Sequence, residues 1–126
     1  MIEYRTMLLN RQLLLDEVDY VSYGLKRSGS AEVLVSFGWD CNLSIDEMWK
    51  EESVAVSEIM AYVLRAEQRG IVVIGKGDIF VKSRDFCLTL CHEGDAHIEG
   101  IADLVPVVLE RWVRLEYQPY GFEQQL

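Results

Sequence analysis

The chain has 126 residues, of which 50% are hydrophobic and 26% are charged, the balance of an ordinary globular protein. This composition excludes intrinsic disorder, which requires low hydrophobicity together with high charge. The 21 acidic residues outnumber the 12 basic ones, so the net charge is -9 and no nucleic-acid ligand is expected, because the field of the protein repels phosphate. The length fits one acidic domain spanning residues 1–126.

The N-terminal segment does not have the form of a secretory signal, because Arg5 and Arg11 interrupt its apolar residues early. No apolar run approaches the roughly 18 to 20 residues that a membrane-spanning helix requires. The three cysteines, Cys41, Cys87 and Cys91, are an odd number, and the last two lie too far apart along a strand for a disulfide. A cytoplasmic protein with reduced thiols and no membrane contact is therefore expected.

The first third of the chain predicts two strands with an ambiguous segment between them. Alternating side chains over residues 1–9 predict the first strand. Residues 11–25 have apolar side chains at helical spacing, but they also contain a β-prone stretch followed by turn residues, so helix and hairpin strand both stay open. The period of two over 31–39, which places Trp39 on the same face as Val33, Val35 and Phe37, predicts the second strand.

The middle of the chain predicts a long helix followed by short strands. Ser44 and Glu47 have the capping-box spacing, and apolar residues then follow at helical spacing, which predicts a helix over 45–69 that ends at Gly70. Glu52 is the one breach of this pattern, so two helices joined near residue 53 stay open. The period then changes, and the short strands are predicted over 71–74, 78–82, 86–91 and 96–99.

The C-terminal part predicts an amphipathic helix over 102–115 and an irregular tail over 117–126, which contains Pro119 and Gly121. Hairpin connections then favour an α+β fold, with an antiparallel or mixed sheet of at least four strands and two main helices packed on one face. The residues expected in the core are Val35, Phe37, Ile59, Val63, Ile74, Phe86, Leu88, Val105, Leu109 and Trp112.

Two short windows hold the whole net charge. Residues 40–58 contain six acids and one base, and residues 91–103 contain four acids and no base. If the fold brings these windows together, they form a negative face that attracts a cationic partner; a solvated surface that only aids solubility stays open. The candidate partner-binding residues are Asp40, Asp46, Glu47, Trp49, Glu51 and Glu52 in the first window and His92, Glu93, Asp95 and His97 in the second.

The densest group of reactive side chains is the run Cys-His-Glu-Gly-Asp-Ala-His at 91–97. In an extended strand Cys91, Glu93, Asp95 and His97 project to one face, and imidazole and carboxylate groups bind divalent metals. Gly94 indicates a turn or bulge that breaks this alternation. No metal-site, nucleophile or phosphate-loop motif is present, so no catalytic residue, metal or cofactor is assigned, and contact with a partner is the preferred role.

The stretch from Asp85 to Glu99, followed by the helix that carries Trp112, resembles the C-terminal half of small bacterial immunity proteins, over residues 71–117. The resemblance implies a cytoplasmic protein, not an enzyme, that binds a cognate basic toxin and neutralises it by covering its active site. It assigns no individual residue. Two other functions stay open: a structural adaptor of a phage or secretion system, and a metal-binding enzyme that uses the His92–His97 cluster.

Overall fold

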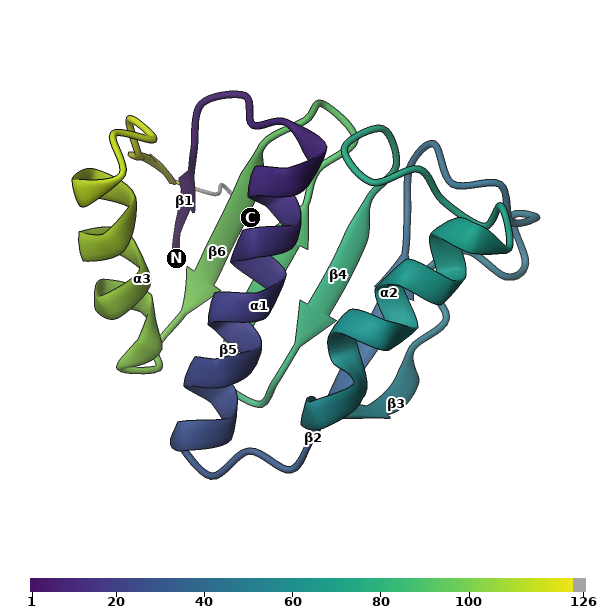
Figure 1. Cartoon of the computed structure of the whole chain (residues 1–126), viewed down its shortest axis with the longest axis horizontal. Coiled ribbons are helices and arrows are strands. Elements are labelled where there is room, and N and C mark those ends of the chain that lie inside the picture. The colour runs from purple at the N-terminus through teal and green to yellow at the C-terminus, as the bar shows by residue number, and fades with distance from the viewer. Residues whose placement is uncertain (124–126) are drawn as a thin grey trace.

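The computed structural model describes residues 1–123. This part of the chain contains one antiparallel sheet of 7 strands in the order β3-β2-β4-β5-β6-β1-β7 (Figure 1). The expected α+β class with a sheet of at least four strands is therefore confirmed. The strands are β1 (Ile2–Arg5), β2 (Glu32–Phe37), β3 (Glu52–Ala55), β4 (Ile79–Lys82), β5 (Phe86–Leu90), β6 (Ala96–Gly100) and β7 (Tyr120–Glu123).

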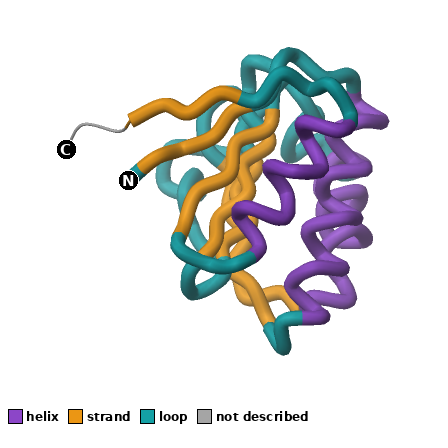
Figure 2. Tube along the Cα trace, turned by 90° about the vertical axis from the view of Figure 1, so that its left-hand side faces the viewer, coloured by secondary structure: helices purple, strands orange, loops and turns teal. Residues whose placement is uncertain are grey.

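Helices cover one face of the sheet, and the described residues place no helix on the opposite, helix-free face (Figure 2). They are α1 (Arg11–Arg27), α2 (Ile59–Gln68), which follows a short 3-10 turn at Val56–Glu58, and α3 (Leu104–Arg114). Residues 11–25, for which helix and strand were both open, lie in α1, so three helices pack on the sheet where two main helices were expected. The side chain of Asn10 caps α1 by accepting a hydrogen bond from the Leu13 N–H at 2.9 Å.

The core lies between the helices and the sheet. Val35, Val81, Leu88 and Ile98 are cross-strand neighbours in β2, β4, β5 and β6, and their side chains form a row that is at most 1% exposed. This row is the period-two pattern of the sequence seen in space, because alternate residues of each strand point toward the helices. Of the residues expected in the core, only Leu109 is partly exposed; the others are buried.

A buried carboxylate joins α1 to α3. Glu17 is 0% exposed, and it accepts hydrogen bonds from the indole N–H of Trp112 and from the guanidinium of Arg111. The Arg111 guanidinium also lies over the ring of Tyr20, 4.4 Å from its centroid. Both oxygens of the buried acid are thus satisfied, as burial of a charge requires.

The predicted helix over 45–69 is wrong in its first half. Ser44 begins only a single turn, in which its carbonyl accepts hydrogen bonds from the N–H groups of Glu47 and Met48. Residues 52–55 form β3 instead, and Val54 lies opposite Val33 on the edge of the sheet. Pairing with an unpaired strand edge, together with burial of Val54, outweighs the local helical spacing, which Glu52 already breached.

Two further predictions are corrected. Residues 71–74 are not a strand of the sheet: they run beside the end of α2, and Ile74 makes only an isolated bridge to Gly77. The expected irregular tail contains β7, in which Gly121 lies opposite Tyr4. Pro119 precedes this edge strand, so it removes no hydrogen bond from the pairing. The last part of the predicted tail, 124–126, lies outside the described residues.

Candidate functional site

The loop between β2 and β3, residues 38–51, places two tryptophans on the helix-free face. The Trp49 ring lies 5.6 Å from the ring of Phe80, whose side chain points away from the helices because its neighbours Ile79 and Val81 point toward them. Trp39 meets Trp49 edge to face at 5.7 Å. Trp39 keeps 60% and Trp49 44% of its surface exposed, so the loop presents an aromatic surface that nothing in residues 1–123 covers fully.

The backbone of this loop is held in an uncommon conformation. Asp40 has φ 61° and Trp49 has φ 69°, in the left-handed region that side chains other than glycine rarely adopt. The Trp49 N–H donates to the Phe37 carbonyl at 2.7 Å, and a Cβ at Gly38 would lie 2.4 Å from the Trp49 ring. The indole thus packs directly on the glycine backbone. Strain of this kind persists where surrounding contacts fix a binding loop.

The loop that carries the two tryptophans is also rich in acidic side chains. Loop 38–51 contains four acids, Asp40, Asp46, Glu47 and Glu51, and one base, Lys50. The only ion pairs of these residues in the described chain are exposed and long, at 3.7 Å from Glu47 to Lys50 and 3.8 Å from Glu51 to Lys82. Such pairs contribute little to stability and do not remove the excess of negative charge in the loop.

Glu52, which was predicted beside these acids, has a different environment. It lies in β3 and accepts a hydrogen bond of 2.5 Å from the hydroxyl of Tyr62 on α2. Burial of the phenol, together with this nearby carboxylate, raises the pKa of Tyr62 to about 12. Glu52 therefore ties β3 to α2.

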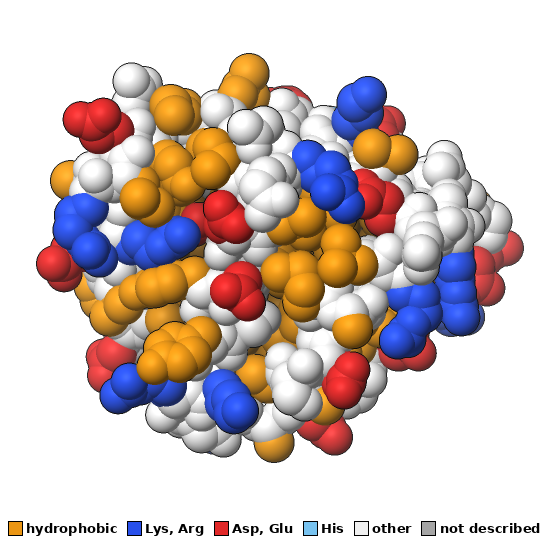
Figure 3. Space-filling model, viewed as in Figure 1, with side chains coloured by type: hydrophobic (Ala, Val, Ile, Leu, Met, Phe, Trp, Pro, Cys, Tyr) orange, Lys and Arg blue, Asp and Glu red, His pale blue; other side chains and the backbone are white. Residues whose placement is uncertain are grey.

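The helix-bearing face differs from loop 38–51, because acidic and basic side chains are interspersed over it (Figure 3). It contains a shallow groove of about 420 Å³ between α1 and α3, which Tyr20, Tyr23, Leu104 and Val107 help to line. The helices thus present no charge of a single sign to a partner.

The reactive run at 91–97 folds into a tight turn between β5 and β6. The Cys91 N–H donates to the Asp95 carbonyl at 2.8 Å, and the Gly94 N–H donates back to the Cys91 carbonyl at 3.0 Å. The turn places Cys91 beside Asp95, with His97 two residues further along β6. Glu93 lies at the tip of the turn, where 73% of its side chain is exposed. Cys91, Asp95 and His97 thus come together as expected. Glu93, the fourth residue expected on that face, points elsewhere because the turn at Gly94 breaks the alternation.

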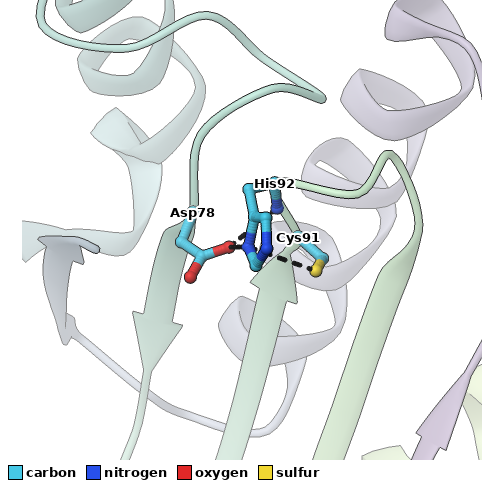
Figure 4. Close-up of side chains that lie close together, drawn as sticks. All are labelled: Asp78, Cys91 and His92. Carbon is cyan, nitrogen blue, oxygen red and sulfur yellow. Dashed lines mark hydrogen bonds and ion pairs between the residues drawn. The ribbon is translucent and has the colours of Figure 1, made fainter. Parts of the chain in front are cut away.

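His92 leaves that face and contacts Asp78, as Figure 4 shows. The Asp78 carboxylate accepts a hydrogen bond from the His92 N–H at 2.7 Å and lies 2.7 Å from His92 Nδ1. This hydrogen bond raises the pKa of His92 above its ordinary value. Cys91 Sγ lies 3.8 Å from the same ring nitrogen.

This geometry does not support nucleophilic catalysis by Cys91. A catalytic histidine faces the nucleophile with one ring nitrogen and its orienting acid with the other, whereas here Cys91 and Asp78 both face Nδ1 of His92. Burial, with the negative charges of Asp95 and Asp78 nearby, raises the pKa of Cys91 to about 12. The thiol is thus protonated at neutral pH and a poor nucleophile.

A second histidine, His97, lies between two buried carboxylates. Its Nε2 is 2.8 Å from Asp95 Oδ2, and its Nδ1 is 3.4 Å from Glu3 Oε1 on the neighbouring strand β1. Glu3 also accepts a hydrogen bond from Arg5 at 2.7 Å. Burial alone would raise the pKa of Asp95, but the hydrogen bond and charge of His97, together with contributions from Cys91 and from the backbone of Asp95, outweigh it and lower that pKa. The second oxygen of Asp95, Oδ1, is buried and has no hydrogen-bond partner in residues 1–123.

The two acidic windows meet only in part. Asp40 lies close enough to His92 for its charge to help raise the pKa of that imidazole, so loop 38–51 and the 91–95 turn share one end of the sheet. Glu99 lies further along β6, opposite Cys87, and Asp103 precedes α3. The second window therefore extends from the end beside Asp40 to the opposite end of the sheet.

The sequence did not single out three residues that the structure places in loop 38–51 or in contact with the 91–97 turn: Trp39, Asp78 and Glu3. Trp39 was expected on the core face, but β2 ends at Phe37 and Gly38 breaks the alternation. Asp78 was predicted only as the first residue of the strand over 78–82. Glu3 carried no signal, since only the pairing of β1 with β6 brings it to His97.

No protein family, no curated protein and no solved structure that was compared matches this chain. No helix in residues 1–123 has both the length and the apolar character that a membrane crossing requires.

Proposed function

We propose that this chain is an immunity-type protein, which binds a basic bacterial toxin through loop 38–51 and neutralises it by covering its active site. The observation that carries the proposal is the exposed pair Trp39 and Trp49 within an acidic loop. Tryptophan is among the residues that supply most of the energy at protein interfaces, where a ring is buried in a pocket of the partner.

The geometry of the loop favours a specific contact. Trp49 is fixed by its packing on Phe80 and by its backbone hydrogen bond to Phe37, so little side-chain entropy is lost when a partner covers it. Trp39 extends the same surface and is the more exposed of the two, at 60%. Together they provide a rigid aromatic anchor.

The charge of the loop selects the partner class. Four acids in the loop that carries the anchor favour a partner surface rich in Lys and Arg, and long-range attraction between the two surfaces raises the association rate. A toxin that acts on nucleic acid or nucleotides carries such a basic surface at its active site, because its substrate is anionic. An acidic loop that fills this cleft takes the place of the substrate. The free cysteines suit a reducing cytoplasm, where such a toxin would be neutralised.

The test uses the full chain as bait in an extract of the cells that encode it, with Trp39→Ala/Trp49→Ala beside the wild type. Tyr23→Ala is the matched control, because Tyr23 is an aromatic residue that is 58% exposed on α1. We expect a basic protein that the wild type and the control retain and the double variant loses. Loss of one anchor costs at least about 2 kcal/mol, roughly 30-fold in affinity. Expression of the captured protein alone should arrest growth, and co-expression of the wild-type chain should restore it.

Three results would contradict the proposal. Equal retention by the double variant would place the contact elsewhere on the molecule. A captured protein whose expression is harmless would indicate an adaptor rather than a toxin inhibitor. Capture of this chain alone would indicate that loop 38–51 is a contact between identical copies.

A further inference from the structure

The side chains at the 91–97 turn offer a set of donors that the proposed toxin contact does not use. Cys91 Sγ, a carboxylate oxygen of Asp95 and a ring nitrogen of His97 lie within 4.8 Å of one another. The three side chains are nearly buried: Cys91 and Asp95 are 6% exposed and His97 is 9% exposed. Ligands of one metal ion have to converge in this way.

In the part of the chain that the structure describes, one buried oxygen of Asp95 has no hydrogen-bond partner, and a cation would provide a partner. Asp95 Oδ1 is buried and accepts no hydrogen bond from any described residue, although buried carboxylate oxygens are nearly always satisfied. Its other oxygen contacts Nε2 of His97 at 2.8 Å. A cation between Asp95, His97 and Cys91 would satisfy this carboxylate and neutralise its charge.

We propose that Cys91, Asp95 and His97 bind one divalent transition-metal ion and that Zn²⁺ is the ion they fit best. A thiolate, an imidazole and a carboxylate are the three ligand types of protein zinc sites, whereas Mg²⁺ and Ca²⁺ prefer oxygen ligands alone. Three protein ligands leave one position of a tetrahedral ion for water.

Glu3 adds the partner that a metal-binding histidine requires. When one ring nitrogen binds a metal, the other is usually held by a carboxylate or a carbonyl group, which fixes the ring. His97 has this arrangement: Nε2 lies 2.8 Å from Asp95 Oδ2, and Nδ1 lies 3.4 Å from Glu3 Oε1. Glu3 is therefore a positioning residue for the site.

Binding requires loss of the thiol proton. The thiol of Cys91 gives its proton to solvent as the sulfur–metal bond forms, with no change of oxidation state. The affinity for zinc should therefore rise with pH.

The test measures Zn²⁺ binding by titration calorimetry to the full chain after a chelator has been removed. We expect one ion per chain, and with Co²⁺ an absorption band from thiolate-to-metal charge transfer. Cys91→Ser or His97→Gln should weaken zinc binding by more than the roughly 10- to 100-fold that loss of an orienting residue costs, and Glu3→Gln should fall within that range.

Two matched controls locate the site. Cys87→Ser changes the neighbouring cysteine of β5, and His92→Gln changes the histidine that contacts Asp78; both should bind zinc as the wild type does. Circular dichroism of the metal-free variants shows whether each one folds. If Cys91→Ser does not fold, the cobalt spectrum of the wild-type chain still tests thiolate ligation.

Absence of the charge-transfer band in the wild type would overturn the proposal. Loss of the band in Cys87→Ser would overturn it as well. Zinc binding that is lost in His92→Gln but kept in His97→Gln would assign the metal to Asp78, Cys91 and His92, against the site proposed. None of these results bears on loop 38–51, so the two proposals fail independently.

Discussion

Replacement of Trp112 by alanine is expected to lower the free energy of unfolding by about 3 to 5 kcal/mol, the range for loss of a buried aromatic side chain. Trp112 is 0% exposed, and its indole N–H donates to the buried Glu17. The substitution leaves a cavity between α3 and the sheet and removes one partner of a buried carboxylate. Urea denaturation followed by circular dichroism measures the change.

Trp49→Ala serves as the control, because this tryptophan is 44% exposed and lies on the helix-free face. We expect it to change the free energy of unfolding by less than Trp112→Ala does. Trp112→Phe should give an intermediate loss, since it keeps most of the ring volume but removes the N–H that donates a hydrogen bond to Glu17. A loss under about 1 kcal/mol for Trp112→Ala would show that the residue does not lie in a packed core.

Substitution of Gly100 by alanine should also destabilise the protein strongly, by about 2 to 5 kcal/mol. Gly100 ends β6 with φ 134°, and a Cβ there would lie 2.2 Å from the carbonyl oxygen of Asp85. That oxygen cannot easily move, because it accepts hydrogen bonds from the N–H groups of Ile101 and Ala102 at 3.0 and 3.1 Å. Thermal and urea unfolding measure the loss.

Gly29→Ala is the control that separates two causes of the loss at Gly100: the steric clash of the new Cβ and the strain of a positive φ. Gly29 also has a positive φ, 89°, but no atom lies within 4 Å of a Cβ placed there. It should cost only the conformational strain, about 1 to 2 kcal/mol. Equal losses at the two glycines would contradict the collision at Gly100.

Regular periodicity predicted those elements whose local pattern and tertiary contacts agree. The period of two around Val35 and the helical spacing around Val105 and Trp112 both mark residues that face the same core, so strand, helix and burial were all predictable. The strand at residues 52–55 was not predictable, because the spacing of apolar residues around it fits a helix. The segment becomes a strand because it pairs with the edge of β2. Local sequence contains no information about an unpaired edge that lies elsewhere in the chain.

In the candidate sites too, local patterns in the sequence were predictable and contacts between distant segments were not. Cys91, Asp95 and His97 lie close in the sequence, and a turn at Gly94 was enough to predict that they depart from simple alternation. Glu3 reaches His97 only because β1 pairs with β6 across more than ninety intervening residues, a contact no spacing rule provides. The charge windows predicted an acidic surface, but their separation at Glu99 and Asp103 depends on the course of β6.

The central claim is that loop 38–51 attracts a basic partner, and the association rate with the captured toxin at increasing ionic strength tests it most directly. The variant Asp46→Lys/Glu47→Lys reverses two exposed loop charges, and Asp19→Lys/Glu110→Lys reverses two exposed charges on α1 and α3. We expect the loop variant to associate at least about 10-fold more slowly at low salt, with a weaker salt dependence, while the control follows the wild type. Both should keep the wild-type free energy of unfolding, because exposed charges contribute little to it. If the loop variant associates as fast as the control at low salt, the acidity of this loop does not guide a partner and the claim is contradicted.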